Sequence, residues 1–155
     1  MKNTLQAIGF ILVSQLAGII GSVFVMPAVD GWYLELTKPS FNPPSWLFGP
    51  VWTLLYTLMG IAAFLVWKKG SGALRRTALT LFGAQLVANS LWSILFFALQ
   101  SPGFAFLNIM ILWVLIVATM VAFYRVSKVA TLLMVPYILW VSFAAFLNYS
   151  IWILN

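Results

Sequence analysis

Tryptophan, tyrosine and amide side chains recur at helical spacing in three hydrophobic stretches of the chain. Trp52 and Tyr56 are four residues apart, so in a helix their side chains share one face. A second stripe, with intervals of four, three and four residues, consists of Gln85, Asn89, Trp92 and Phe96. A third stripe consists of Trp140, Ala144 and Asn148. The stripes predict helices that present aromatic rings and amides to a shared interior.

The chemistry that these stripes offer is stacking and hydrogen bonding. An amide in hydrocarbon costs free energy unless it is bonded, so Gln85 and Asn89 are expected to face protein or a cavity. For a single amide the default interpretation is a bond between two helices. With Trp52, Trp92 and Trp140 as flat walls, the two amides also suit a planar, mostly apolar ligand that needs a few donors to orient it. Both interpretations stay open.

Several other kinds of chemistry are excluded by composition. Cysteine and histidine are absent, which excludes disulfides, thiol redox chemistry, zinc sites and histidine-ligated haem. We therefore expect no metal site and no obligatory cofactor. The only acids, Asp30 and Glu35, fall in one predicted loop, so proton-driven transport through an intramembrane carboxylate is disfavoured. No residue pattern supplies the acid and base of conventional catalysis.

Long hydrophobic segments must position these side chains. Of the 155 residues, 64% are hydrophobic and 6% are charged, which is too little polar surface for a water-soluble globule. A bilayer core of about 30 Å needs roughly 20 apolar residues per helix. We predict an all-α integral membrane protein, a five-transmembrane-helix bundle that forms a single domain over residues 1–155. The predicted spans lie near residues 5–26, 45–67, 77–99, 104–124 and 129–153, with an outer loop over residues 27–44.

The distribution of charge predicts the orientation of the spans. With five spans, the N-terminus and the second and fourth loops share one side, which holds seven of the eight basic residues. Lys38 is the only cation on the other side. The positive-inside rule therefore places the N-terminus in the cytoplasm and the C-terminus outside. Because the cations are dispersed over three segments, nucleic acid is not an expected partner, whereas membrane lipid is.

The first loop is long, aromatic and rich in proline. Its prolines, Pro39, Pro43 and Pro44, restrict the backbone and make the loop stiff. One interpretation is an interfacial turn whose Trp32, Tyr33 and Trp46 belong to the aromatic belt of the membrane. The other is a cover over a binding site, because long ordered loops on a scaffold often bind or gate. The sequence leaves these two interpretations open.

These residues resemble the family of tryptophan-rich sensory proteins, whose animal members are the mitochondrial translocator proteins or peripheral benzodiazepine receptors. The resemblance is carried by four blocks, Trp32-Tyr33-x-x-Leu36-x-Lys38-Pro39-Ser40-Phe41-x-Pro43-Pro44, Val51-Trp52-Thr53-Leu54-Leu55-Tyr56, Gln85-x-x-x-Asn89-x-x-Trp92-x-x-x-Phe96-Phe97 and Val135-Pro136-Tyr137-x-x-Trp140. The blocks extend from the first loop to the last span, so the resemblance covers almost the whole chain.

The resemblance implies a five-helix bundle, commonly a homodimer, in a bacterial cytoplasmic membrane. It also implies a receptor or sensor that binds porphyrins such as protoporphyrin IX, and benzodiazepine-type ligands, in a pocket near the first loop. Such a protein would influence tetrapyrrole homeostasis and the stress response. By position, the residues that match the family's pocket are Trp52, Asn89, Trp140, Tyr33, Pro43, Tyr56, Trp92 and Ala144. With Gln85 and Phe96 from the second stripe, these are the candidate ligand-binding residues.

The resemblance also implies an alternative function. Some bacterial members are described as degrading porphyrins in light, and Trp52 and Trp140 stand at the implicated positions, so they are candidate catalytic residues if such degradation occurs. A further alternative, suggested by a pocket inside a membrane bundle, is passive transport of tetrapyrroles. Five spans without an inverted repeat give it weak support, because alternating access usually uses paired halves. Sterol binding is not expected, because Tyr149 is not followed by the basic residue of the animal sterol motif.

Small residues at spacing four suggest where helices approach closely. In the first span these are Ser14, Gly18 and Ser22, which we interpret as helix packing. In the third span, Ala84 and Ala88 are a candidate contact between two copies of the chain.

Overall fold

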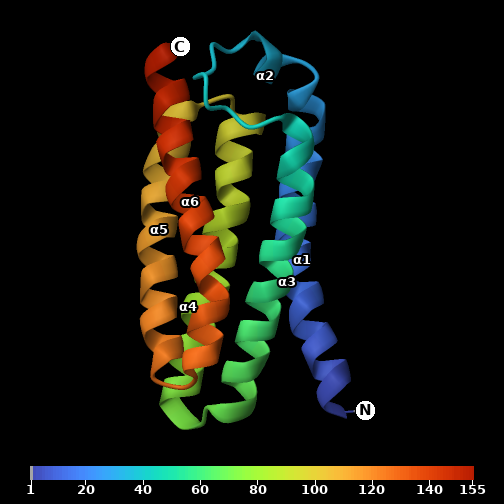
Figure 1. The fold of residues 1–155 in the computed structure, drawn as a ribbon, viewed down its shortest axis with the longest axis vertical. Coiled ribbons are helices and arrows are strands. Elements are labelled where there is room, and N and C mark those ends of the chain that lie inside the picture. The colour runs from blue at the N-terminus through green and yellow to red at the C-terminus, as the bar shows by residue number, and fades with distance from the viewer. Residues whose placement is uncertain (1) are drawn as a thin grey trace.

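The computed structural model describes residues 2–155, and its long elements are all helices. In chain order they are α1 (Lys2–Val29), α2 (Trp32–Glu35), α3 (Ser45–Lys69), α4 (Gly72–Ser93), the π-helical η1 (Ile94–Ala98), α5 (Pro102–Tyr124) and α6 (Lys128–Leu154). The long helices lie side by side, and α2 lies across one end of the bundle (Figure 1). Within the described residues there is no strand, so the predicted all-α architecture is confirmed.

The outer surface of the bundle is suited to lipid. Five helices, with η1 continuing α4, are long and apolar enough to cross a membrane. Large side chains such as Val23, Val114 and Leu139 are exposed on them, with 61% of Val114 and 65% of Leu139 accessible. A water-soluble monomer rarely exposes apolar surface on this scale. The protein is therefore an integral membrane protein.

The five long helices form a closed ring. Contacts between neighbours follow the order α1, α3, α6, α5, α4 and back to α1. Small residues allow the closest approach, since a Cβ added at Gly60 of α3 would collide with the backbone of Ile11 in α1. Buried side chains such as Met59, Ala63 and Met134 fill the interior of the ring in the half away from α2. A cavity occupies the other half.

The first predicted boundary needs a correction. Helix α1 continues through Pro27 to Val29, so the loop begins at Asp30 rather than at residue 27. Proline lacks only its own N–H, which in the last turn removes a single bond, to the carbonyl of Val23. The neighbouring N–H groups continue the helix for two more residues. The loop also contains the single helical turn α2, in which the N–H of Leu34 donates to the Gly31 carbonyl at 2.9 Å.

The second connection is shorter than predicted. Helix α4 begins at Gly72 rather than near residue 77, so the connection consists of residues 70 and 71 alone. Gly72 has a φ of 55°, a left-handed conformation that favours glycine and permits the sharp turn. Lys68 and Lys69 lie in the last turn of α3, where the helix dipole favours cations. The basic residues that were predicted to lie in the second loop are therefore part of α3 and α4.

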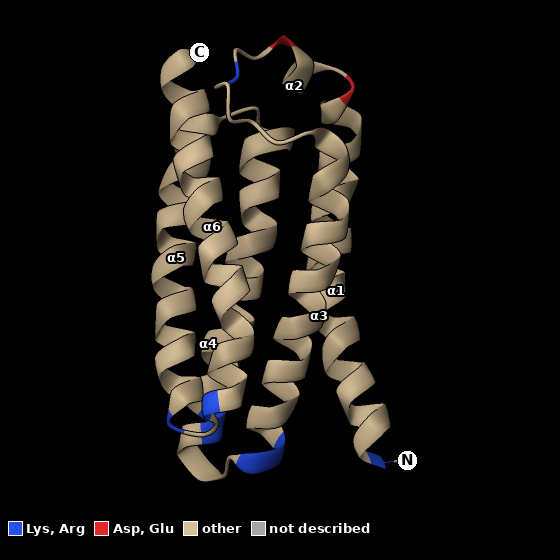
Figure 2. Ribbon diagram, in the orientation of Figure 1, with Lys and Arg blue, Asp and Glu red and all other residues tan. Residues whose placement is uncertain are grey.

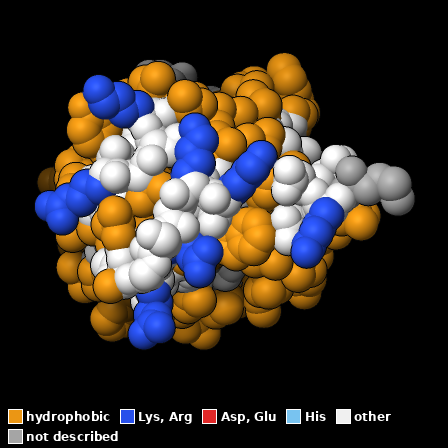
Figure 3. Space-filling model, turned by 90° about the horizontal axis from the view of Figure 1, so that it is seen from below, with side chains coloured by type: hydrophobic (Ala, Val, Ile, Leu, Met, Phe, Trp, Pro, Cys, Tyr) orange, Lys and Arg blue, Asp and Glu red, His pale blue; other side chains and the backbone are white. Residues whose placement is uncertain are grey.

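The charged residues lie at the two ends of the bundle, and both acids are at the same end (Figure 2). Seven cations lie at one end, which we call the basic end, and Figure 3 shows them spread over that face. They are Lys2, Lys68, Lys69, Arg75, Arg76, Arg125 and Lys128. The opposite end, which we call the loop end, holds Asp30, Glu35 and Lys38 together with the C-terminus.

A candidate ligand cavity at the loop end

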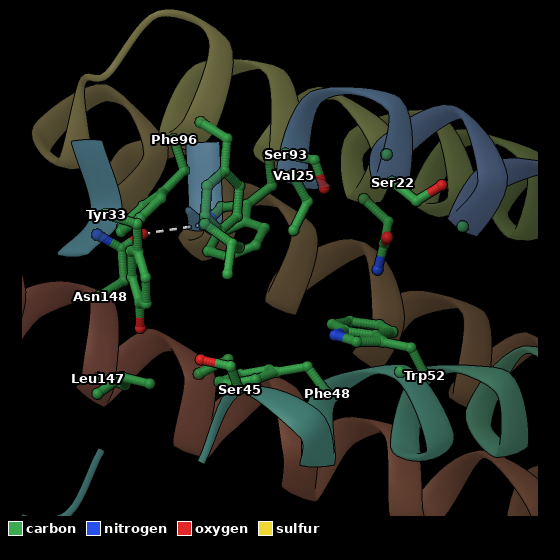
Figure 4. A pocket seen from close by; sticks show the side chains of 18 of the residues that line it. Ser22, Val25, Tyr33, Ser45, Phe48, Trp52, Ser93, Phe96, Leu147 and Asn148 are labelled. Carbon is green, nitrogen blue, oxygen red and sulfur yellow. Dashed lines mark hydrogen bonds between the residues drawn. The ribbon is translucent and has the colours of Figure 1, made fainter. Parts of the chain in front are cut away.

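A cavity of about 210 Å³ lies inside the ring of helices toward the loop end. Its walls come from α1, α3, α4, η1 and α6, and α2 contributes Tyr33 (Figure 4). No charged side chain lines it, and most of its lining is aliphatic or aromatic. The cavity therefore suits an apolar ligand that has a few polar atoms.

Three tryptophans from three helices line the cavity, and neighbouring rings hold each of them in place. Trp52 of α3 stacks on Tyr56, with ring centroids 5.4 Å apart and planes at 28°. Trp92 of α4 stacks in the same way on Phe96 at 5.2 Å. Trp140 of α6 meets the ring of Phe48 edge-on at 6.0 Å. The stripes predicted from spacing thus converge on one space, and Figure 4 shows the Trp52 indole extending into it. Ala144, the next residue of the third stripe, also lines this space.

The π-helical segment η1 brings two consecutive phenylalanines to the cavity. In η1 the N–H of Leu99 reaches back five residues to the Ile94 carbonyl at 2.9 Å. Both Phe96 and Phe97 line the cavity. Such wide turns are frequent at functional sites.

Tyr33 of α2 covers the loop end of the cavity. Its ring is buried and lies 5.8 Å from the Phe97 ring, and its hydroxyl donates to Asn42 Oδ1 at 3.0 Å. Burial raises the pKa of the Tyr33 phenol above its ordinary value, and the bond to Asn42 opposes this effect only in part. Tyr33 is therefore a neutral group at physiological pH.

The rest of the first loop combines both interpretations that the sequence left open. Trp46 is 73% exposed, as expected of a residue in the interfacial belt. Trp32 instead packs edge-on against Phe96 at 5.8 Å. The loop is tied to the end of α6, because the N–H of Thr37 donates to Asn155 Oδ1 at 2.9 Å and Asn155 Nδ2 donates to the Thr37 carbonyl at 3.0 Å. These two hydrogen bonds hold the cover in place.

A chain of side-chain hydrogen bonds closes the deep end of the cavity. The Tyr56 hydroxyl donates to Asn89 Oδ1 at 2.5 Å, and Asn89 Nδ2 donates to the Tyr137 hydroxyl at 3.0 Å. The Tyr137 hydroxyl in turn donates to Gln85 Oε1 at 2.7 Å, and Gln85 Nε2 approaches Met59 Sδ at 3.8 Å. The chain links α3, α4 and α6, so it fixes the spacing of three walls.

Two of the candidate ligand-binding residues lie outside the lining. Gln85 is fully buried one turn deeper than Asn89, with its amide engaged in the chain just described. Pro43 lies in the loop, where its carbonyl accepts a bond from Asn42 Nδ2 at 3.1 Å. Asn89 does line the cavity, and its bonds leave one amide hydrogen and one lone pair of Oδ1 available.

The third stripe also ends in an amide that is engaged by the protein. Asn148 Oδ1 accepts from Trp92 Nε1 at 2.9 Å, and its Nδ2 donates to the Pro102 carbonyl at 2.8 Å. By contrast, Trp140 Nε1 is buried and is the one such side-chain atom without a partner in residues 2–155. Protein atoms cover this N–H, so a small rotation of the indole would be needed to present it to a ligand. A ligand acceptor there would remove the cost of an unpaired donor.

The first span contributes a wall that the sequence did not predict. Gly18, Gly21 and Ser22 line the cavity, although the spacing of Gly18 and Ser22 was interpreted only as packing. Gly18 does pack closely, since a Cβ there would overlap the Tyr56 ring. Small residues that face an aromatic stripe on a neighbouring helix are the signal that could have identified this wall.

The candidate contact between two chains is partly used within one chain. Ala88 is buried, and its carbonyl accepts from Asn108 Nδ2 of α5 at 2.9 Å. Ala84 is exposed. The stripe is therefore covered by α5 at one of its two positions, because α4 and α5 pack side by side.

Comparison with known proteins places this architecture in one family. The model of the TspO/MBR family matches residues 10–153. The chain is 48% identical to the tryptophan-rich protein TspO of Chlorobaculum tepidum, over 89% of this chain and 88% of that protein. It is 44% identical to the tryptophan-rich protein TspO of Archaeoglobus fulgidus, over 99% of both chains. It is 39% identical to the human translocator protein, over 94% of this chain and 88% of that protein. With the four sequence blocks, the five-helix ring and these full-length similarities in agreement, the chain belongs to the TspO/MBR family.

Proposed function

We propose that this protein is a membrane receptor that binds protoporphyrin IX-type tetrapyrroles in the cavity, and that benzodiazepine-type ligands use the same space. The observation that carries the proposal is an uncharged cavity walled by Trp52, Trp92 and Trp140 from three different helices. A tetrapyrrole is flat and mostly apolar, so the three indole rings offer it a large contact area. Through such binding the protein would sense or sequester tetrapyrroles and so influence their homeostasis under stress.

Binding in this cavity would depend on stacking and shape. Among the residues that line it there is no histidine, cysteine or methionine, and the hydroxyls of its two tyrosines, Tyr33 and Tyr56, are bonded to Asn42 and Asn89 instead of being free to ligate iron. Free-base porphyrin should therefore bind at least as well as haem. Asn89 and Trp140 would orient the ligand, the first through its remaining amide hydrogen and the second through its unpaired indole N–H.

Entry of a tetrapyrrole would require the cover to move. Pockets for drug-sized ligands usually measure roughly 300–1,000 Å³, and the cavity of about 210 Å³ is smaller. The first loop is the part of the lining that is not a membrane span, and it is held by the bonds between Thr37 and Asn155. We expect these bonds to break when the ligand enters and to form again over it.

The orientation that we propose for the protein in the membrane rests on its distribution of charge. With the seven cations of the basic end in the cytoplasm, the loop end and its cover face outward. In a bacterial cytoplasmic membrane the ligand would then enter from the outer side.

A titration in the dark tests the proposal. Protoporphyrin IX added to purified protein in detergent should quench tryptophan fluorescence saturably. Loss of one stacking indole in Trp140→Ala should weaken binding roughly tenfold or more, by analogy with base stacking on aromatic side chains. Trp113→Ala is a matched control, because Trp113 lies outside the cavity and bonds Ser142 instead. An absence of saturable quenching, or equal affinity in both variants, would refute the proposal.

A second candidate function is the light-dependent oxidation of the bound porphyrin. The observation that favours it is that Trp52 and Trp140 line the same cavity, so both oxidisable indoles could touch one macrocycle. Light and oxygen would drive the reaction, because the lining supplies no acid or base. Under illumination, wild type should give a product spectrum that neither Trp52→Phe nor free porphyrin in detergent gives. Identical spectra in all three samples would exclude this function.

A further inference from the structure

The charge of the proposed ligand conflicts with the cavity that would hold it. Protoporphyrin IX carries two propionate side chains, which are ionised at neutral pH. The residues that line the cavity carry no charge. A carboxylate without a partner in such surroundings is strongly disfavoured. The propionates must therefore leave the apolar space at one of its ends.

The deep end of the cavity offers the propionates no cation. It is closed by the neutral chain of hydrogen bonds through Tyr56, Asn89, Tyr137 and Gln85, and packed apolar side chains lie beyond it. The seven cations of the basic end lie at the far side of that packed half (Figure 2). The propionates would consequently point toward the loop end, where Tyr33 lines the cavity.

Lys38 is the single cation of the loop end, and it lies against this same tyrosine. Its Nζ is 4.7 Å from the centroid of the Tyr33 ring. The ammonium donates to the carbonyls of Leu34 at 3.3 Å and Leu36 at 3.1 Å, so these bonds tie it to the backbone of the loop beside Tyr33. A lysine has three N–H donors, and these two bonds leave one of them for a further acceptor.

The charge of Lys38 is also not neutralised by the protein. Its partners within residues 2–155 are two carbonyls and one aromatic ring, and none of them is a carboxylate. The two acids of the loop end, Asp30 and Glu35, are both exposed. They repel an incoming dianion, so recognition of carboxylates at this end depends on a cation in a fixed position.

We propose that Lys38 is the specificity-determining residue for the ligand's carboxylates, and that it makes the cavity prefer tetrapyrroles with free propionates over their neutral esters. This inference rests on the proposed function. The macrocycle lies among the tryptophans, Tyr33 separates it from the ammonium, and one propionate passes the edge of that ring to meet Lys38 Nζ. A charge-assisted bond of this kind is stronger than a neutral one.

The test compares two porphyrins in the dark, protoporphyrin IX and its dimethyl ester. We expect wild type to bind both, and Lys38→Gln to lose roughly tenfold in affinity for the diacid, the scale of one charge-assisted bond. The affinity of this variant for the diester should change less than about twofold, since the diester has no carboxylate that could form a charge-assisted bond with Lys38. Lys38→Arg should retain the preference for the diacid. Lys128→Gln is a matched control, because Lys128 Nζ also lies over a tyrosine, Tyr124, at 5.6 Å, but at the basic end.

The outcomes separate this inference from the proposed function. If neither porphyrin binds wild type saturably, the proposed function fails. If wild type binds both and Lys38→Gln weakens both equally, Lys38 supports only the loop, and the inference is wrong. If Lys38→Gln changes neither affinity, the inference is also wrong and the binding function stands. Higher salt should weaken binding of the diacid to wild type, because it screens the attraction to Lys38. It should not weaken binding to Lys38→Gln, in which only the repulsion by Asp30 and Glu35 is left to screen.

Discussion

The Tyr137 hydroxyl donates a hydrogen bond to Gln85 Oε1 at 2.7 Å in the centre of the bundle, where both side chains are completely buried. The bond joins α6 to α4 below the cavity. It holds Gln85 away from the lining and leaves Asn89 as the amide of the second stripe that borders it. The stripe thus divides into a structural end and a ligand-facing end.

Gln85→Leu should therefore affect stability more than binding. The substitution leaves the buried Tyr137 hydroxyl without its acceptor, which should cost about 1–3 kcal/mol of unfolding free energy. Protoporphyrin affinity should stay within about twofold, a change of less than ~0.5 kcal/mol. Thermal unfolding in detergent and the porphyrin titration measure the two effects. A large loss of affinity at unchanged stability would mean that Gln85 reaches the ligand after all.

Gly18→Ala should displace a wall of the cavity. The added Cβ would overlap the Tyr56 ring, and Tyr56 holds Asn89 through its hydroxyl. We expect lower thermal stability together with weaker porphyrin binding. Gly83→Ala is the control, since a Cβ there meets no atom within 4 Å. Through helix propensity this control should raise the unfolding free energy by at most about 1 kcal/mol. Equal changes in thermal stability and porphyrin affinity in the two variants would contradict the close contact of α1 with α3.

Asn155→Ala should loosen the cover. It removes the bonds in both directions between the Asn155 amide and the backbone of Thr37. Amide hydrogen exchange over residues 30–44 should become faster, and porphyrin should associate faster because the loop must open for entry. Ser150→Ala serves as the comparison, because the Ser150 hydroxyl bonds only the Phe146 carbonyl on an exposed face of the same helix. Unchanged loop exchange in Asn155→Ala would show that other contacts hold the cover.

The sequence predicted the helices well because length and hydropathy alone determine a membrane span. One boundary error falls where polar residues extend a helix beyond the bilayer, as Arg75 and Arg76 do at the start of α4. The other falls at the end of α1, where the helix continues through Pro27 although a proline was expected to end it. The stripes predicted which faces turn inward, but spacing gives no depth along the helix. For that reason Gln85 and Asn89 were treated alike, although the structure places them at different levels.

Other features of the site leave no local pattern in the sequence. Thr37 and Asn155 are 118 residues apart, and one of them bonds through its backbone, so no motif indicates the pair. The wall formed by Gly18 and Gly21 follows a small-residue spacing that packing alone also explains. Only the arrangement of the ring decides that these glycines face aromatic side chains.

The central claim is that the ligand occupies this cavity, and the most direct measurement is porphyrin binding by a variant in which the cavity is filled. Ala144 lines the cavity, so the benzyl group of Ala144→Phe takes up much of its volume of about 210 Å³. Ala84→Phe adds the same group at an exposed position of α4. In dark titrations with protoporphyrin IX, the account predicts that Ala144→Phe loses at least about tenfold in affinity, or ~1.4 kcal/mol, while Ala84→Phe binds like wild type. Equal affinity in all three proteins would place the ligand elsewhere and contradict the account.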